Sequence, residues 1–126
     1  MLPQELRDAS VSIQSRLTKL QQSIKQLEKS KMDVGSESDN YDMRQALIAK
    51  MTETNGNVKA LKQELEDFEQ ISVNYNQEKT KKDKHRAFET VFLDLAFKYD
   101  KLSNEINIKM KQFLDLAMER KQTLYS

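Results

Sequence analysis

The sequence predicts an all-α protein, an antiparallel up-down-up three-helix bundle with long, coiled-coil-like helices. Apolar residues recur at alternating steps of three and four in three long segments, which places them along one side of a helix. Only two glycines and one proline occur in 126 residues, whereas a sheet protein needs many turn residues. A chain of this length is expected to form one domain, residues 1–126.

The first helix is predicted over residues 4–33. Pro3 suits its start, because the missing N–H of proline has no helical partner in the first turn. The apolar positions of this segment are Leu6, Ile13, Leu17, Leu20, Ile24 and Leu27. The stretch VGSESDN, residues 34–40, then breaks the pattern with glycine, serine and acidic residues. We expect a short loop there, with Asp39 and Asp42 capping the next helix.

The second helix is predicted over residues 40–74. Its apolar positions are Met43, Leu47, Met51, Val58, Leu61, Leu65 and Phe68, with one polar layer at Thr54. Gly56 is expected on the opposite side, where it weakens the helix without disturbing the core. Short loops make sequential helices antiparallel neighbours, so this helix should return alongside the first.

The third helix is predicted over residues 81–122, after the polar stretch NYNQEKTKKD at residues 74–83. Its apolar positions are Phe88, Val91, Phe92, Leu95, Tyr99, Leu102, Ile106, Met110, Phe113 and Ala117. This stripe is the widest of the three, which predicts that the third helix is the central one. Three further apolar residues, Leu93, Phe97 and Ile108, fall on its opposite side. We take these three as candidate partner-binding residues, with incidental exposure as the alternative.

No pattern indicates an enzyme, a metal site or a cofactor site. His85 is the only histidine, and it has neither the second histidine of a zinc helix nor a nucleophile and an acid in a catalytic spacing. We expect it in the first turn of the third helix, either solvated or packed. Gly35 and Gly56 are too far apart to form a phosphate-binding loop.

Charge and hydropathy exclude two further classes of function. The chain carries 21 Lys and Arg against 20 Asp and Glu, so it lacks the basic excess of a nucleic-acid binder. The basic run KTKKDKHR, residues 79–86, is predicted to be a solvated loop, with contact to an acidic partner or an anionic lipid surface as the alternative. No uninterrupted apolar stretch approaches the length of a membrane span, so the chain as given is expected to be soluble, without membrane insertion.

Two stretches carry a family resemblance. YDMRQALIAKMTETNGNVKALKQEL, residues 41–65, is similar to the second helix of endosomal and vacuolar syntaxins, with Thr54 and Asn55 at the position of the family's Thr-Asn pair. TKKDKHRAFETVFLDLAFKYDKL, residues 80–102, resembles the third helix, with Tyr99 as the mid-helix aromatic residue. The chain therefore resembles the N-terminal Habc domain of a syntaxin-type (Qa) SNARE.

The resemblance implies a regulatory domain of a t-SNARE in vesicle and endomembrane fusion. It would lie on the cytoplasmic face of an endosome, a vacuole or the trans-Golgi. The implied partner is a SNARE-motif helix, intramolecular or from a cognate SNARE, held between the second and third helices. A Sec1/Munc18-type protein or a tethering or adaptor protein is a further candidate. However, the N-terminal peptide that some syntaxins offer to Sec1/Munc18-type proteins is not recognisable in MLPQELRDAS.

Two alternatives to a syntaxin-type domain stay open. The stretch FLDLAFKYDKL, residues 92–102, also resembles a helix of an Alix-type ESCRT adaptor arm, although a complete arm needs far more chain. A spectrin-like structural repeat is the other alternative, but such repeats usually carry a core tryptophan, which this sequence lacks.

Overall fold

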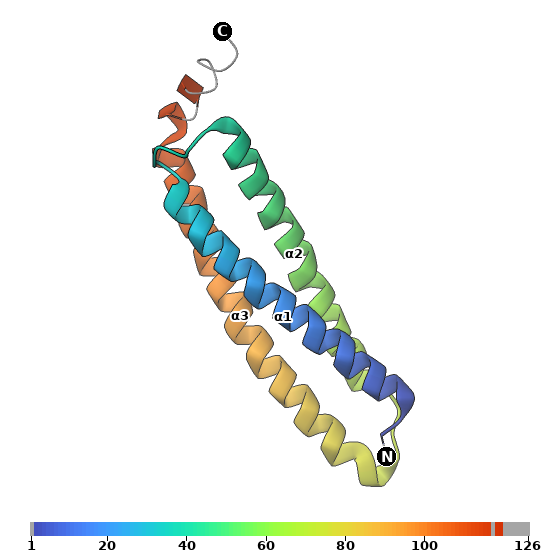
Figure 1. Cartoon of the computed structure of the whole chain (residues 1–126). Coiled ribbons are helices and arrows are strands. Elements are labelled where there is room, and N and C mark those ends of the chain that lie inside the picture. Colours follow the sequence, from blue (N-terminus) through green and yellow to red (C-terminus); the bar gives the residue numbers. More distant parts are fainter. Residues whose placement is uncertain (1, 117, 120–126) are drawn as a thin grey trace.

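The computed structural model describes residues 2–116, 118 and 119. It contains α1 (Gln4–Asp33), α2 (Tyr41–Gln70) and α3 (Glu78–Gln112), with a short 3-10 helix, η1 (Tyr75–Gln77), directly before α3. Figure 1 shows α1 and α3 running in the same direction with α2 antiparallel to both, and each helix packs against the other two. The described part of the chain has no strand. The predicted all-α up-down-up bundle is confirmed.

The core consists of the apolar residues at three-four spacing. Its fully buried large side chains come from all three helices and the first loop, and include Leu6, Ile13, Leu20, Leu27, Val34, Leu61, Phe68 and Ile106. Thr54 is also buried, and its hydroxyl donates to the carbonyl oxygen of Lys50 at 2.7 Å, within its own helix. The polar layer expected at Thr54 therefore lies in the core without an unpaired hydroxyl.

The prediction that the third helix is central is wrong. α3 contributes five buried residues, whereas α1 contributes seven and α2 contributes eight. Val91 and Phe113, both counted in its wide stripe, are exposed, and Phe88 and Met110 are only partly buried. The extra width of the stripe therefore lies beyond the arc that contacts α1 and α2.

The second loop differs from the prediction at both of its helix junctions. α2 ends at Gln70 rather than at residue 74: Ile71 is already extended, with φ −67° and ψ 125°, and Asn74 is the N-cap residue of η1. The side chain of Gln77 in turn accepts from the backbone N–H of Asn74 at 3.1 Å. α3 begins at Glu78, before the predicted residue 81, so residues 79–86 are helical and not a loop.

The cap of α2 and the end of α3 also differ from the prediction. Asn40, rather than Asp39 or Asp42, caps α2, and its side chain accepts from the backbone N–H of Met43 at 2.8 Å. α3 ends at Gln112, where a turn at Phe113 interrupts the helix. The predicted end at residue 122, like Ala117, lies outside the described residues.

A cation from a neighbouring helix binds carbonyl oxygens at the C-terminal ends of α1, α2 and α3. Lys109 Nζ binds Lys31 O at 2.9 Å, Lys81 Nζ binds Glu69 O and Ile71 O at 3.0 Å each, and Arg44 binds Met110 O and Phe113 O. Only α1 is followed by a glycine, the residue that most often closes a helix. The cations thus add donors at helix ends, where the last carbonyl groups lack the N–H groups of a further helical turn, although Lys31 O also accepts from the backbone N–H of Val34 at 3.3 Å.

Replacing Gly56 by alanine is expected to stabilise the protein by about 0.5–1 kcal/mol. Gly56 lies in the middle of α2 on its exposed side, and a Cβ atom there would have no neighbour within 4 Å. The gain comes from helix propensity alone, since no contact is made or lost. Urea denaturation of the variant and the wild type measures it, and a loss of stability would show that the backbone at Gly56 needs glycine.

Candidate functional site

The three candidate residues from the sequence lie on the outer side of α3. Leu93, Phe97 and Ile108 have exposed fractions of 57%, 72% and 58%. Their positions at the surface agree with the helical spacing, and their binding of a partner stays a prediction. We call them the outer row of α3.

Exposed apolar side chains gather on α3 and the turn that follows it. The large exposed hydrophobic residues there are Val91, Leu93, Phe97, Ile108, Phe113, Leu114 and Met118. Among the described residues, α1 exposes only Val11 and Met32 of this kind, and α2 exposes only Ile48. The helix predicted to be the most buried is therefore the one that offers the most apolar surface.

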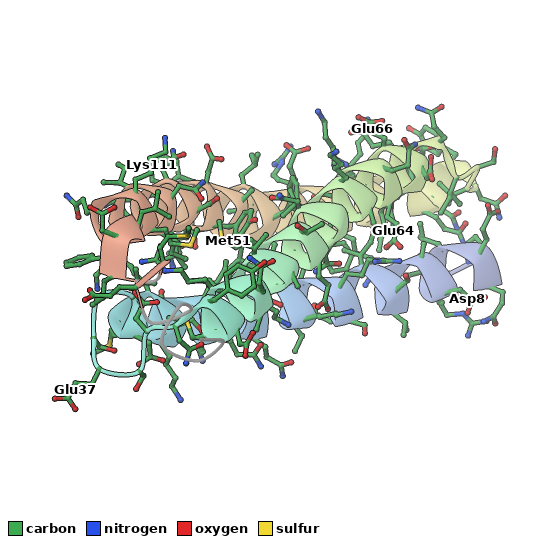
Figure 2. All side chains as sticks on the ribbon, turned by 90° about the horizontal axis from the view of Figure 1, so that it is seen from above. Asp8, Glu37, Met51, Glu64, Glu66 and Lys111 are labelled. Atoms are coloured by element: carbon green, nitrogen blue, oxygen red, sulfur yellow. The ribbon has the colours of Figure 1, made fainter. Side chains whose placement is uncertain are left out.

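A hollow of about 520 Å³ lies between the start of α2 and the end of α3. Its lining residues are Tyr41, Arg44, Gln45 and Ile48 from α2 and Asn107, Met110, Lys111, Leu114 and Met118 from α3 and the turn after it. Lys111 follows Ile108 by three residues, so the hollow borders the outer row. Figure 2 shows the Lys111 side chain pointing away from α2. We call this feature the α2–α3 hollow.

Sequence reasoning missed the contribution of α2 to this surface. Ile48 directly follows the core residue Leu47 and lies off the three-four stripe, in the same way as Phe97 on α3. An isolated apolar residue beside a stripe is common at protein surfaces, so Ile48 alone gave no usable signal. Only the packing of α2 against α3 brings it near Met110 and Leu114.

Each pair of helices is joined by its own polar contacts; we call the line of contact between two helices a seam. Arg16–Glu64 and Lys19–Glu53 ion pairs join α1 to α2. Lys31 and Glu105 join α1 to α3, and this lysine holds the pKa of the Glu105 carboxylate below its ordinary value. The α2–α3 seam is held at its middle by a buried tyrosine and at one end by Arg44.

Tyr99 of α3 forms the middle contact of the α2–α3 seam. Its hydroxyl donates to the carbonyl oxygen of Met51 at 2.9 Å, and the side-chain oxygen of Asn55 lies 2.5 Å away. Figure 2 shows Met51 on the side of α2 that faces α3. Burial raises the pKa of the Tyr99 phenol above its ordinary value of 10.0, because the charged form loses its hydration.

Tyr99→Phe is expected to cost about 1–2 kcal/mol at neutral pH, since the carbonyl of Met51 and the side-chain oxygen of Asn55 lose the phenol as a donor. The raised pKa favours the neutral phenol in the folded state. The contribution of the phenol to the free energy of unfolding is therefore complete below pH 10.0, and it is lost as the pH rises through the pKa of Tyr99 in the folded protein. The difference in stability between wild type and variant should thus stay constant below pH 10.0 and shrink as the pH rises above it, as measured by urea denaturation at each pH. A difference that also stays constant above that pH would show that the phenol is not shielded from water.

Arg44 forms the end contact of the same seam, where the first loop and the end of α3 lie at one pole of the bundle (Figure 1). Arg44 and Asp39 are both buried and form an ion pair at 2.9 Å. The guanidinium also donates to the carbonyl oxygens of Met110 and Phe113. We call this set of contacts the Arg44 clasp. Asp39, predicted as a cap, is instead the partner of a buried arginine.

His85 lies at the opposite pole of the bundle, where it packs against α2. It sits two turns inside α3, not in the first turn, because α3 begins at Glu78. Its ring centroid is 6.2 Å from that of Phe68, and Nδ1 is 3.4 Å from Glu69 and Nε2 3.8 Å from Glu89. Across residues 2–116, 118 and 119, no group of histidine, cysteine and acidic side chains is arranged to hold a metal ion.

Comparison with known proteins identifies the family. A family model described as syntaxin-like protein matches residues 9–124, nearly the whole chain. The chain belongs to the syntaxin-like family. The resemblance to an N-terminal Habc domain is thereby confirmed, and the Alix-type and spectrin-like alternatives lose their support. No curated protein and no solved structure matches the chain. In the part of the syntaxin-like chain that the structure describes, no helix is long and apolar enough to cross a membrane.

The residues that carried the family resemblance meet in the fold. Asn55, of the Thr-Asn pair, lies against the hydroxyl of Tyr99, the mid-helix aromatic residue. Thr54, the other member of the pair, is buried in the core. In this syntaxin-like domain the two sequence motifs therefore form one polar contact between α2 and α3.

Proposed function

We propose that this domain regulates a SNARE protein by binding a SNARE-motif helix along the α2–α3 side of the bundle. The observation that carries the proposal is the gathering of exposed apolar side chains on α3 beside Ile48. An amphipathic helix that lays its apolar face on such a surface gains affinity by burying it. The family membership supports a SNARE helix as the occupant.

The proposed mechanism is competition. A SNARE helix held on this surface is withheld from the fusion complex, so the domain controls when that complex assembles. If the helix belongs to the same polypeptide, tethering raises its effective concentration and makes a weak contact sufficient. The role is non-catalytic, in vesicle fusion at the cytoplasmic face of an endosomal, vacuolar or trans-Golgi membrane. A Sec1/Munc18-type, tethering or adaptor protein is the alternative occupant.

Phe97→Ala is expected to weaken binding of a SNARE-motif peptide by about 1–3 kcal/mol, the usual scale for an aromatic anchor. Its effect on the free energy of unfolding should stay within about 0.5 kcal/mol, because the side chain is 72% exposed. Isothermal titration and thermal denaturation of the same variant measure the two quantities.

Met32→Ala is the matched control for that titration. Met32 is 75% exposed but lies at the end of α1, where it lines a hollow with Leu102 and Glu105 of α3. Its replacement should leave both affinity and stability unchanged. Equal losses of affinity in the two variants would place the partner elsewhere, and a fall in stability for Phe97→Ala would make Phe97 a core residue.

A further inference from the structure

Arg44 joins three segments of the chain at one pole of the bundle. We infer that it is a positioning residue for the α2–α3 hollow, because it holds the end of α3 where Met110 and Leu114 line that hollow. Its effect on helix affinity rests on the function proposed above. Its hold on α3 can be measured without any partner.

The guanidinium of Arg44 makes four hydrogen bonds in two directions. Toward the loop, Nε and Nη2 donate to the two carboxylate oxygens of Asp39 at 3.0 and 2.9 Å. Toward α3, Nη1 donates to Met110 O at 2.6 Å and Nη2 to Phe113 O at 2.9 Å. One rigid planar group therefore fixes the distance between the loop, α2 and the end of α3.

The loop between α1 and α2 adds two contacts to the Arg44 clasp, both through Gly35. The backbone N–H of Gly35 donates to Asp39 Oδ2 at 2.8 Å, which fixes the carboxylate from its other side. Gly35 has a φ of +84°, and a Cβ atom at this position would lie 2.8 Å from the ring of Phe113. The close approach of that ring to Gly35 is a second contact between the loop and the end of α3.

Arg44 acts on the hollow by fixing the position of the end of α3, which lines it. The positive charge of Arg44 is already neutralised by its ion pair with Asp39. Asp39 is fully buried, and its two carboxylate oxygens accept from Nε and Nη2 of Arg44, so the guanidinium is not offered to a carboxylate of a partner. A lysine keeps the charge but has a single nitrogen, which cannot reach the carboxylate and two carbonyl oxygens in one geometry. Arg44→Lys therefore removes the planar group with several donors while the positive charge is kept.

Lys81 provides a matched control at the opposite pole. Its Nζ binds the carbonyl oxygens of Glu69 and Ile71 at the end of α2, far along the bundle from the α2–α3 hollow. Lys81→Met removes the cation that binds the carbonyl oxygens at this helix end. This variant should destabilise the end of α2 near Lys81 and leave the structure of the α2–α3 hollow unchanged.

The test combines amide hydrogen exchange with titration of a SNARE-motif peptide. In Arg44→Lys, the amides of Phe113 and Gly35 should exchange about tenfold faster, and that of Ile71 should be unchanged. In Lys81→Met, the amide of Ile71 should exchange faster and those of Phe113 and Gly35 should exchange at the wild-type rate. Affinity for the peptide should fall about fivefold or more in Arg44→Lys and stay at the wild-type value in Lys81→Met.

Each outcome decides one part of the inference. Unchanged exchange at Phe113 in Arg44→Lys would overturn the claim that Arg44 holds the end of α3. Faster exchange there with unchanged affinity would overturn the claim that this hold shapes the hollow for a helix. If the wild-type domain binds no SNARE-motif peptide, the proposed function is wrong, and exchange at Phe113 alone decides whether Arg44 positions α3.

Discussion

Replacing Arg44 by methionine is expected to lower the free energy of unfolding by about 3–5 kcal/mol, the range found when one partner of a buried ion pair is removed. The cause is the Asp39 carboxylate, which has no exposed surface and would lose both of its hydrogen bonds to the guanidinium. The carbonyl oxygens of Met110 and Phe113 would lose donors in the same step. Chemical denaturation with urea measures the loss.

The double variant Arg44→Met, Asp39→Asn separates the stranded charge from the lost hydrogen bonds. A neutral amide costs much less to bury than a carboxylate, so the second change should recover part of the stability lost in the first. A single variant that loses less than about 1 kcal/mol would show that water reaches Asp39 once Arg44 is gone. An absence of recovery in the double variant would assign the loss to the carbonyl groups of α3.

Leu95→Ala is expected to lower the free energy of unfolding by about 2–5 kcal/mol, through lost burial and the cavity left behind. Leu95 belongs to the core, with an exposed fraction of 8%. Phe97→Ala, two residues further along the same helix, is the matched control and should change stability by no more than about 0.5 kcal/mol. Similar losses in the two variants would contradict the packing of α3, since it places Leu95 inside and Phe97 outside.

The fold could be predicted because its determinants are local and repeated. Leu6, Leu20, Leu61 and Ile106 follow a three-four spacing that any long helix would bury on one side, and all four are fully buried. Helix ends were predicted less well, because capping depends on a few side chains. Asn40 competes with Asp39 as a cap, and the sequence alone does not show which of them is already engaged by Arg44.

The Arg44 clasp could not be predicted, because its partners are far apart in the sequence. In the sequence Arg44 looks like an ordinary polar residue on a helix surface, yet it binds carbonyl oxygens 66 and 69 residues further along the chain. Lys81 was placed in a solvated loop for the same reason, although it closes the end of α2. Backbone carbonyl groups carry no sequence signal, so a cation that binds them is recognisable only in the folded chain.

The candidate surface was predicted in part. The off-stripe positions of Leu93, Phe97 and Ile108 predicted their exposure, because a helix of known register fixes which side each residue takes. The hollow beside them needs Ile48 of α2 and Leu114 beyond the end of α3. Their approach depends on the crossing of two helices and on the turn at Phe113, neither of which follows from periodicity.

The most direct test of the proposed function is an NMR titration of the ¹⁵N-labelled domain with an unlabelled SNARE-motif peptide. Binding along the α2–α3 side predicts shifted amide signals at Ile48, Phe97 and Ile108, with the signal of Val11 on α1 unchanged. Shifts that centre on Val11 would contradict the proposed surface. An unchanged spectrum at saturating peptide would contradict the binding of a SNARE helix by this domain.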